Sequence, residues 1–194
     1  KIKNNYAEAH YNLGILKQNI NELDSAIDSY KNALLIKPNY VSALNNIGNI
    51  MNEKDCQDEA LRYYNMGLNY DPENPDILNN LANILVDKNQ YSKALEYFNL
   101  ALKSSKDPAK IYNNIGNLYS KQNLLDDSIY YFKKGIEFNP NSYEIYNNLG
   151  IAYRKNKKID LSISALKTAI EFNINYPEAY NNLALTYQED EKVD

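Results

Sequence analysis

A period of 34 residues runs through the sequence and restricts the possible folds more than any other feature. At 147–150, two Asn residues are followed by a branched aliphatic residue and a small residue. The same pattern returns at every 34-residue step, six times in all, with Tyr11 in place of the first Asn in the earliest copy. A fixed period of this length is typical of a solenoid, in which each unit packs only against its neighbours. The five full repeats are 7–40, 41–74, 75–108, 109–142 and 143–176, and a half repeat follows at 177–194.

Each full repeat contains two stretches with helical periodicity, which in the first repeat we place at 7–20 and 24–37. Between the two stretches, four of the five repeats carry Asn or Asp, which tolerate the left-handed backbone of a tight turn, whereas the fifth carries Lys157. Three residues after this turn position stands an Asp or Ser that we interpret as the N-cap of the second helix. The five predicted N-caps are Asp24, Asp58, Ser92, Asp126 and Asp160.

Two other positions of the repeat are constrained in size. One position in the first helix holds only Gly or Ala, in the order Gly14, Gly48, Ala82, Gly116, Gly150 and Ala184. One position in the second helix holds a large side chain, in the order Tyr30, Tyr64, Phe98, Phe132 and Leu166. A small residue lets two backbones approach closely, so we expect the two helices of each repeat to pack tightly at these positions.

The helix–turn–helix of 34 residues, the small and large columns and the prolines that end three second helices (Pro38, Pro72 and Pro140) resemble the tetratricopeptide-repeat family. The resemblance covers nearly the whole chain. It implies an all-α fold, a right-handed superhelical solenoid of antiparallel helix pairs whose first helices line a concave groove. We expect one array over 7–194, with its loosest junction at 103–108.

Both ends of the sequence resemble interrupted repeats. The segment "IKNNY" at 2–6 mirrors "IKPNY" at 36–40, so residues 1–6 are interpreted as the tail of a preceding repeat. The last repeat stops after its first helix. The sequence is therefore expected to be a fragment of a longer protein.

Two adjacent columns of the first helix are almost entirely Asn. The first Asn column holds Tyr11 and then Asn45, Asn79, Asn113, Asn147 and Asn181. Eleven of the twelve places in the two columns are Asn, against 21 Asn among the other 182 residues, so compositional bias alone does not explain them. Asn inside a helix costs roughly 0.6 kcal/mol against Ala, or about 6 kcal/mol for eleven. Either the amides bond between neighbouring repeats and fix their stacking, or they recognise a ligand.

The second Asn column is the stronger candidate for recognition, because an amide can both donate to and accept from the backbone of an extended peptide. It resembles the asparagine ladder of O-linked N-acetylglucosamine transferases, whose arm of such repeats holds substrate backbone. The resemblance implies peptide binding by Asn12, Asn46, Asn80, Asn114, Asn148 and Asn182. Asn49, Asn83 and Asn117 lie three residues later and extend the same polar face. The first Asn column is left open between a structural and a binding role.

Charges along the predicted groove change sign. Acidic residues, among them Glu8 and Asp76, lie in the first half, and Lys110, Lys121 and Arg154 lie in the second. This gradient either orients a ligand or is only a solvated face. Chaperone adaptors of the family clamp a C-terminal carboxylate with Lys and Arg, but Lys110 alone matches such a position.

The sequence shows no catalytic constellation, so the chain is not expected to be an enzyme or to hold a cofactor or metal. His10 is interpreted as a packing residue and Cys56 as a free surface thiol. The net charge of −4 argues against nucleic acid as a partner, and no apolar run is long enough for a membrane span. A cytoplasmic or nuclear location is expected.

We predict a protein-interaction scaffold that holds an extended peptide or partner segment in the concave groove. One alternative is the substrate-selecting arm of a glycosyltransferase whose catalytic domain lies outside this sequence. Another is an assembly scaffold that forms a homodimer through the apolar face of its last helix.

Overall fold

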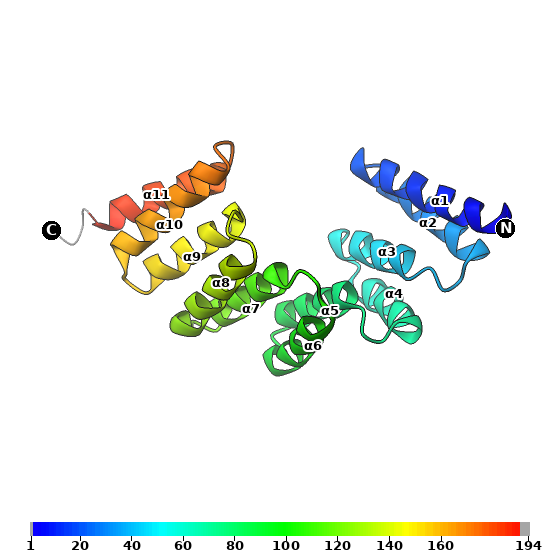
Figure 1. Cartoon of the computed structure of the whole chain (residues 1–194), viewed down its shortest axis with the longest axis horizontal. Coiled ribbons are helices and arrows are strands. Elements are labelled where there is room, and N and C mark those ends of the chain that lie inside the picture. Colours follow the sequence, from blue (N-terminus) through cyan, green and yellow to red (C-terminus); the bar gives the residue numbers. More distant parts are fainter. Residues whose placement is uncertain (1, 191–194) are drawn as a thin grey trace. The chain divides into compact units, whose positions relative to one another are not determined.

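The chain is a succession of helices connected by short turns (Figure 1). The computed structural model describes residues 2–190, and the side chains from residue 6 onward. Within this range it has eleven helices and no strand, which confirms the predicted all-α fold. The helices are α1 (Ile2–Asn19), α2 (Leu23–Ile36), α3 (Val41–Glu53), α4 (Gln57–Tyr70), α5 (Pro75–Asp87), α6 (Tyr91–Ser104), α7 (Ala109–Lys121), α8 (Leu125–Phe138), α9 (Tyr143–Lys155), α10 (Ile159–Phe172) and α11 (Pro177–Asp190).

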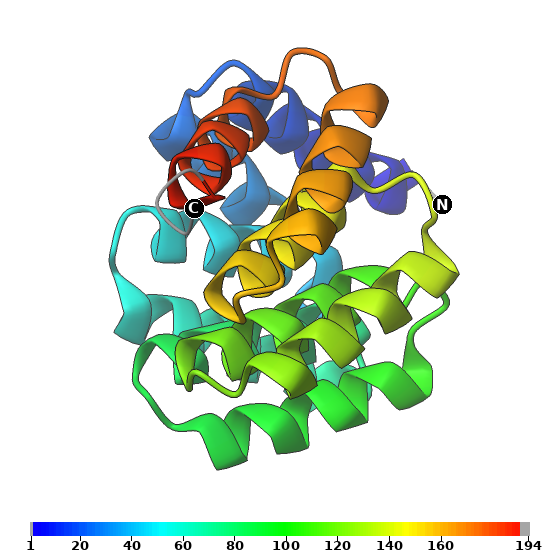
Figure 2. The ribbon, with the colours of Figure 1, turned by 90° about the vertical axis from the view of Figure 1, so that its left-hand side faces the viewer.

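Each odd-numbered helix pairs with the even-numbered helix that follows it, and the two run antiparallel (Figures 1 and 2). Each pair corresponds to one 34-residue repeat, and α11 is the first helix of the sixth. Helix α1 is longer than the other first helices and begins at Ile2, within the segment compared above with 36–40. Asn4 stands where Pro38 ends α2, so no proline interrupts the helix there.

Contacts divide the chain into two compact units, 1–104 and 105–194. The first unit contains α1 to α6 and the second contains α7 to α11. The boundary falls inside 103–108, the segment that the sequence singles out as the loosest junction. The prediction that one array continues through both units stays a prediction, and each unit is described below by itself.

The small and large columns meet inside each repeat, as predicted. A Cβ atom added to Gly48 would lie 2.4 Å from the ring of Tyr64, and one added to Gly116 would lie 2.6 Å from the ring of Phe132. The large side chains are completely enclosed: Tyr64 and Phe132 are each 1% exposed. Glycine is therefore required here for helix contact rather than for backbone freedom.

The turn inside each repeat depends on one residue with a positive φ. The angle lies between 56° and 62° at the predicted turn residues Asn21, Asp55, Asn89 and Asn123, which confirms that prediction. Lys157 adopts the same conformation, with φ of 59°, although its side chain is unfavourable there. The fold thus imposes the turn on Lys157 through its neighbours.

The prediction that Asp24, Asp58, Ser92, Asp126 and Asp160 are N-caps is wrong, because each lies inside its helix. Helix α2 begins at Leu23 with Glu22 as its N-cap, so Asp24 lies inside the first turn, and α4, α8 and α10 begin at equivalent places. None of these four N-caps makes a side-chain capping bond. The Asp side chains instead pair with Lys residues of the next repeat, in Asp24–Lys54, Asp58–Lys88 and Asp126–Lys158.

Candidate functional site

The two Asn columns form a ladder of hydrogen bonds between neighbouring first helices. The amide nitrogen of a second-column Asn donates to the first-column side chain 35 residues earlier, in the preceding repeat. Three of these bonds join amide to amide: Asn80 to Asn45 at 3.0 Å, Asn148 to Asn113 at 3.0 Å, and Asn182 to Asn147 at 2.9 Å. At the first junction Asn46 donates to the hydroxyl of Tyr11 instead, at 3.4 Å. We call each such bond a rung.

The rungs give the first Asn column a structural role. Asn147 is only 4% exposed, and a buried amide is costly unless it is hydrogen-bonded. Its Oδ1 receives the rung from Asn182. The hydrogen bonds that the structural interpretation of this column requires are therefore present at Asn45, Asn113 and Asn147.

The rungs do not use all the hydrogen-bonding groups of the second Asn column. An amide has two N–H donors and one acceptor oxygen, and the rung from Asn148 to Asn113 uses one donor. Asn148 and Asn182 are half-buried rather than buried, so their other groups face outward. A second-column Asn can thus bond to its neighbour and still contact a ligand.

In the first unit, residues of α3, α4 and α5 line a small polar cavity of about 160 Å³ that is open to solvent. We call it the α3–α5 cavity. Asn49 is its centre: its Oδ1 accepts from the Tyr64 hydroxyl at 2.7 Å and from Asn80 Nδ2 at 2.7 Å. Burial raises the pKa of Tyr64, so its hydroxyl stays protonated and remains a donor. The lining residues are Asn49, Asn52, Glu53, Tyr64, Asn80 and Asn83.

The equivalent position one repeat earlier has a different network. Ile15 stands where Asn49 stands in the second repeat. The hydroxyl of Tyr30 therefore donates to Gln18, at 2.8 Å, and accepts from Asn46 at 3.2 Å. Burial raises the pKa of Tyr30 as well. In the second unit Phe132 fills the same column and has no hydroxyl to donate.

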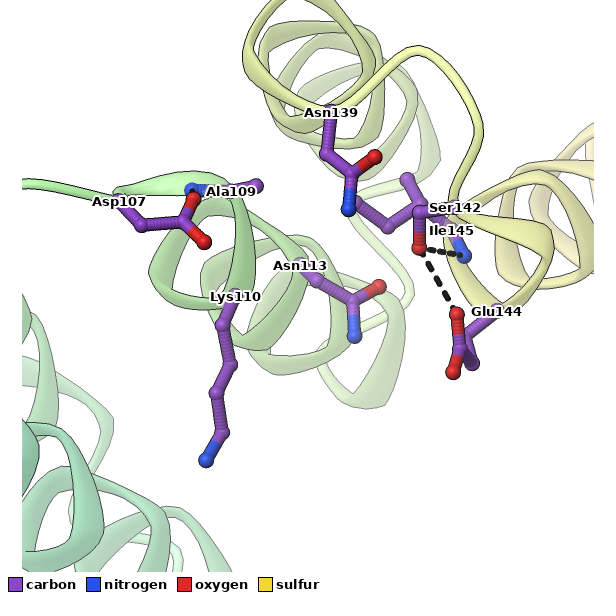
Figure 3. A pocket seen from close by; sticks show the side chains of 8 residues that line it. All are labelled: Asp107, Ala109, Lys110, Asn113, Asn139, Ser142, Glu144 and Ile145. Carbon is purple, nitrogen blue, oxygen red and sulfur yellow. Dashed lines mark hydrogen bonds between the residues drawn. The ribbon is translucent and has the colours of Figure 1, made fainter.

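In the second unit, a cavity of about 280 Å³ lies between the starts of α7 and α9 (Figure 3). Figure 3 shows the amide of Asn113 and the carboxylate of Glu144 directed into the same space, while Lys110 extends away from Glu144. The hydroxyl of Ser142 donates to Glu144 at 2.9 Å and accepts from the amide of Ile145 at 3.4 Å, which caps α9. The cavity therefore has polar groups on two neighbouring first helices.

The predicted groove cations differ in availability. Arg154 is 18% exposed in its side chain and pairs with Glu189 at 2.6 Å, so its charge is already balanced within the chain. Lys110 forms no ion pair among residues 2–190 and lines the second-unit cavity. Lys121 is exposed at the end of α7. Of the three, Lys110 is the cation that the structure places at a cavity.

The other predicted binding residues also lie on the first helices. Asn12 is exposed, and Asn114 is half-buried. Asn83 and Asn117 are half-buried and have no hydrogen-bond partner in the part of the chain that the structure describes. Their amides are consequently the clearest groups for an external ligand.

Sequence reasoning missed the hydroxyl of Tyr64, because its column was interpreted only as packing. Two observations could have revealed it: this column holds Tyr in the first two repeats and Phe in the next two, and Asn49 lies fifteen residues earlier in the same repeat as Tyr64. Asn52 was missed as well. It lines the α3–α5 cavity one turn after Asn49.

The described residues carry no arrangement typical of a metal or membrane site. No three His, Cys, Asp or Glu side chains within 2–190 are grouped so that they could hold a metal ion. Cys56 is an exposed free thiol, as predicted. None of the described helices is both long and apolar enough to cross a bilayer.

Comparison with protein families identifies repeats over most of the chain. Family models described as "Tetratricopeptide repeat" match residues 7–40, 58–114, 109–142 and 131–163. A further model, described as "TPR repeat", matches 152–190. No curated protein matches the sequence.

Several solved structures share the fold. PilF of Pseudomonas aeruginosa is 16% identical over 100% of both chains, with a TM-score of 0.83. PilW, described as a widely conserved type IV pilus biogenesis factor, is 16% identical over 96% of this chain and 91% of its own, with a TM-score of 0.80. YrrB, described as a TPR protein with an unusual peptide-binding site, is 23% identical over 89% of both chains, with a TM-score of 0.61. At these identities the similarity concerns the fold.

Proposed function

The chain belongs to the tetratricopeptide-repeat family, and from this premise we propose that it is a non-catalytic protein-interaction scaffold. In the proposed mode of binding, an extended segment of a partner protein lies against the amide side chains of the first helices. The glycosyltransferase arm considered from the sequence stays a prediction.

The observation that carries the proposal is the division of the amides into two groups. The rungs hold one group in place between repeats, whereas Asn83 and Asn117 have no partner among the described residues. An extended segment has N–H and C=O groups that its own backbone does not pair. Asn side chains can bond to both, whatever the partner's side chains are.

Neutral amides distinguish this mode from recognition by charge. Arg154 is already paired, and the net charge of the chain is −4. Binding through amide hydrogen bonds should therefore depend weakly on ionic strength, since salt screens charges but not neutral hydrogen bonds.

The test begins with a display library of random peptides selected on the full chain. The affinity of the tightest peptide is then measured for the wild type and for the double variant Asn83→Ala, Asn117→Ala. We expect the dissociation constant to rise about tenfold, because each lost hydrogen bond contributes about 0.5–1.5 kcal/mol. The thermal midpoint should not fall, since neither side chain bonds to another residue that the structure describes.

A matched control is available on the second helices. Asn65 and Asn99 are exposed on α4 and α6, so Asn65→Ala, Asn99→Ala removes the same chemistry from another face. We expect this control to bind like the wild type. Equal affinity in all three proteins, or an equal loss in both variants, would contradict binding at the first helices.

Self-association is a second candidate function, favoured by α11. Its side chains Tyr180, Leu185 and Tyr187 are 45%, 46% and 40% exposed, so large apolar side chains of this helix are open to contact with a second copy. Light scattering over a dilution series tests it, together with Leu185→Glu, which should shift any dimer to monomer. A monomer at every concentration excludes this function.

A further inference from the structure

We propose that the α3–α5 cavity binds one C=O and one N–H that the partner presents side by side, and that the Tyr64 hydroxyl, together with Asn80, sets the direction in which this amide pair binds. The inference rests on the proposed function, because the partner segment supplies the amide. It assigns Tyr64 a role beyond packing, as a positioning residue that acts through Asn49.

The first argument is the hydrogen-bonding capacity that remains on Asn49. Its Oδ1 accepts from Tyr64 and from Asn80, and two bonds use both lone pairs of an amide oxygen. No other bond of Asn49 is found in the described chain. Asn49 can therefore offer a ligand only its two N–H donors.

The second argument is that Asn80 keeps a free acceptor, whereas Asn49 keeps free donors. Its Nδ2 donates to Asn45 at 3.0 Å and to Asn49 at 2.7 Å, which uses both of its N–H groups. What remains is the acceptor, Oδ1. The cavity thus has a donor on Asn49 beside an acceptor on Asn80.

The same hydrogen bonds also determine which end of the Asn49 and Asn80 amides is the oxygen and which is the NH₂ group. Turning the Asn49 amide over would place its NH₂ group against the NH₂ group of Asn80, so two donors would face each other. Turning over Asn80 would place its oxygen against the oxygens of Asn45 and Asn49. An Asn without such neighbours can present either end to a ligand.

The remaining groups are accessible to a ligand. Among the described residues, the buried side-chain nitrogen or oxygen atoms without a hydrogen-bond partner include none from Asn49 or Asn80. The free N–H groups of Asn49 and the free oxygen of Asn80 therefore reach solvent. Both residues line the same cavity of about 160 Å³.

An amide group matches this arrangement. Its C=O accepts from Asn49 and its N–H donates to Asn80. A carboxylate has no donor for Asn80, and Glu53 in the lining repels it. An ammonium group has no acceptor for Asn49. An Asn or Gln side chain carries the C=O and one N–H on the same edge of its amide. In an extended backbone the N–H and C=O of one residue also point to the same side, although they belong to successive peptide groups, so either source can supply the pair.

The chain offers a clean variant and a matched control. Phe98 and Phe132 fill the column of Tyr64 in the next two repeats, so Tyr64→Phe should keep the packing and remove only the hydroxyl. Tyr30→Phe removes the equivalent hydroxyl in the first repeat. That hydroxyl bonds to Gln18 and Asn46, with Ile15 in place of Asn49.

The experiment measures the affinity of the peptide selected above for the full chain and for both variants. Tyr64→Phe should raise the dissociation constant about fivefold to tenfold, because Asn49 then keeps only one of the two bonds that hold its amide and its oxygen regains a free lone pair. Tyr30→Phe should leave it within about twofold. The unfolding midpoints of the two variants separate this effect from a general loss of stability.

Two series of peptides identify the source of the amide. In one series each backbone N–H is replaced in turn by N–CH₃, and in the other each Asn or Gln is replaced by Ala. N-methylation at the critical position weakens binding to the wild type but not further to Asn80→Ala, because the bond from that N–H is already absent there. Replacing a critical Asn or Gln by Ala weakens binding to Asn80→Ala less than to the wild type, because only the bond to Asn49 is left to lose. If the critical position is found in the N–CH₃ series, the amide comes from the backbone. If it is found in the Ala series, the amide comes from an Asn or Gln side chain.

Side-chain NMR signals provide a readout that a merely structural role would not change. The NH₂ signals of Asn49 should shift as the peptide is added, whereas those of Asn80 should be protected from exchange before and after binding. Unchanged affinity in Tyr64→Phe, or unmoved Asn49 signals at saturation, would contradict this inference alone. If the wild type binds no peptide, the proposed function fails and the inference fails with it.

Discussion

A rung joins two Asn residues at places where Ala would make each isolated helix more stable. The rung offsets this by pairing polar groups that the stacking of repeats removes from water. Asn147 shows the need most clearly, since it is 4% exposed and its oxygen accepts from Asn182. The same kind of side chain therefore stabilises the fold at one position and remains available to a ligand at another.

Asn80→Ala should lower the free energy of unfolding by about 1–3 kcal/mol. The substitution removes the donor to Asn45 and the second donor to Asn49, and a hydrogen-bonding group left without its partner is costly. Denaturant unfolding followed by circular dichroism measures the change, and the slope of the transition should stay constant.

Asn83→Ala is the control for that measurement. It lies one turn after Asn80 in α5 and loses no bond within the described chain, so the better helix propensity of Ala should raise stability by up to about 0.6 kcal/mol. If both variants change stability by the same amount, the rungs do not hold the repeats together.

At the scale of the element, the turn at Lys157 is the clearest source of strain. A side chain such as Lys costs about 1–2 kcal/mol in the left-handed conformation, and Asn tolerates it better. Lys157→Asn should raise the free energy of unfolding by about 1 kcal/mol, measured by thermal melting. Its long-range pair with Glu189, at 4.0 Å and exposed, contributes little.

The reverse exchange at an equivalent turn gives the control. Asn123 has φ of 59°, so Asn123→Lys should lower stability by a similar amount. Two changes of the same sign would show that the turn conformation is not the cause.

Asp126 connects the first turn of α8 to the loop before α10. Hydrogen bonds from Lys158 and Asn156 lower the pKa of its carboxyl below the ordinary value of 3.8. A lowered pKa in the folded state stabilises the fold above the unfolded pKa, and this is lost as the pH falls through the lowered value. Asp126→Asn should therefore lower the melting temperature slightly at neutral pH and leave it unchanged near about pH 2.

Asp127→Asn controls for the change in net charge, since Asp127 has no ion pair in the part of the chain that the structure describes. A pH dependence shared by both variants would assign the effect to overall charge rather than to the contact between repeats.

The sequence predicted the elements that depend on nearby residues. Helix periodicity placed α2 within one residue, and Asn21 and its equivalents marked the left-handed turns. It placed the Asp column wrongly as N-caps, because helix starts shift by one or two residues without changing the periodic pattern. The rungs were not predictable as pairs, because an offset of 35 residues depends on how one repeat rotates on the next. The bond from Tyr64 to Asn49 lies within one repeat and was missed because the Tyr64 column was interpreted only as packing.

At the scale of the whole molecule, burial is uneven among the first helices. Helix α9 buries six of its residues, whereas α11 buries only Ala179 and Thr186. Helix α3 buries five, and the described side chains of α1 include only Ala7 and Gly14 as buried. In a solenoid each repeat is stabilised by its immediate neighbours. A helix that its neighbours bury less should therefore unfold locally more often.

Hydrogen exchange followed by mass spectrometry should show this order. Amides in α3 should exchange more slowly than those in α1, and amides in α9 more slowly than those in α11, each comparison being made within one unit. Uniform protection across all four helices would mean that the chain opens as one cooperative block.

Every rung spans 35 residues, one more than the repeat, so it belongs to the joint between two repeats and not to either alone. Duplication of a gene segment that encodes 34 residues would insert one complete repeat. Its second-column Asn could form a rung to the repeat before it, and its first-column Asn could accept a rung from the repeat after it. A copy whose length is not a whole number of periods would put the two Asn residues of a rung out of register. An array of this kind can therefore become longer or shorter by unequal recombination without a compensating mutation, provided that whole periods are gained or lost.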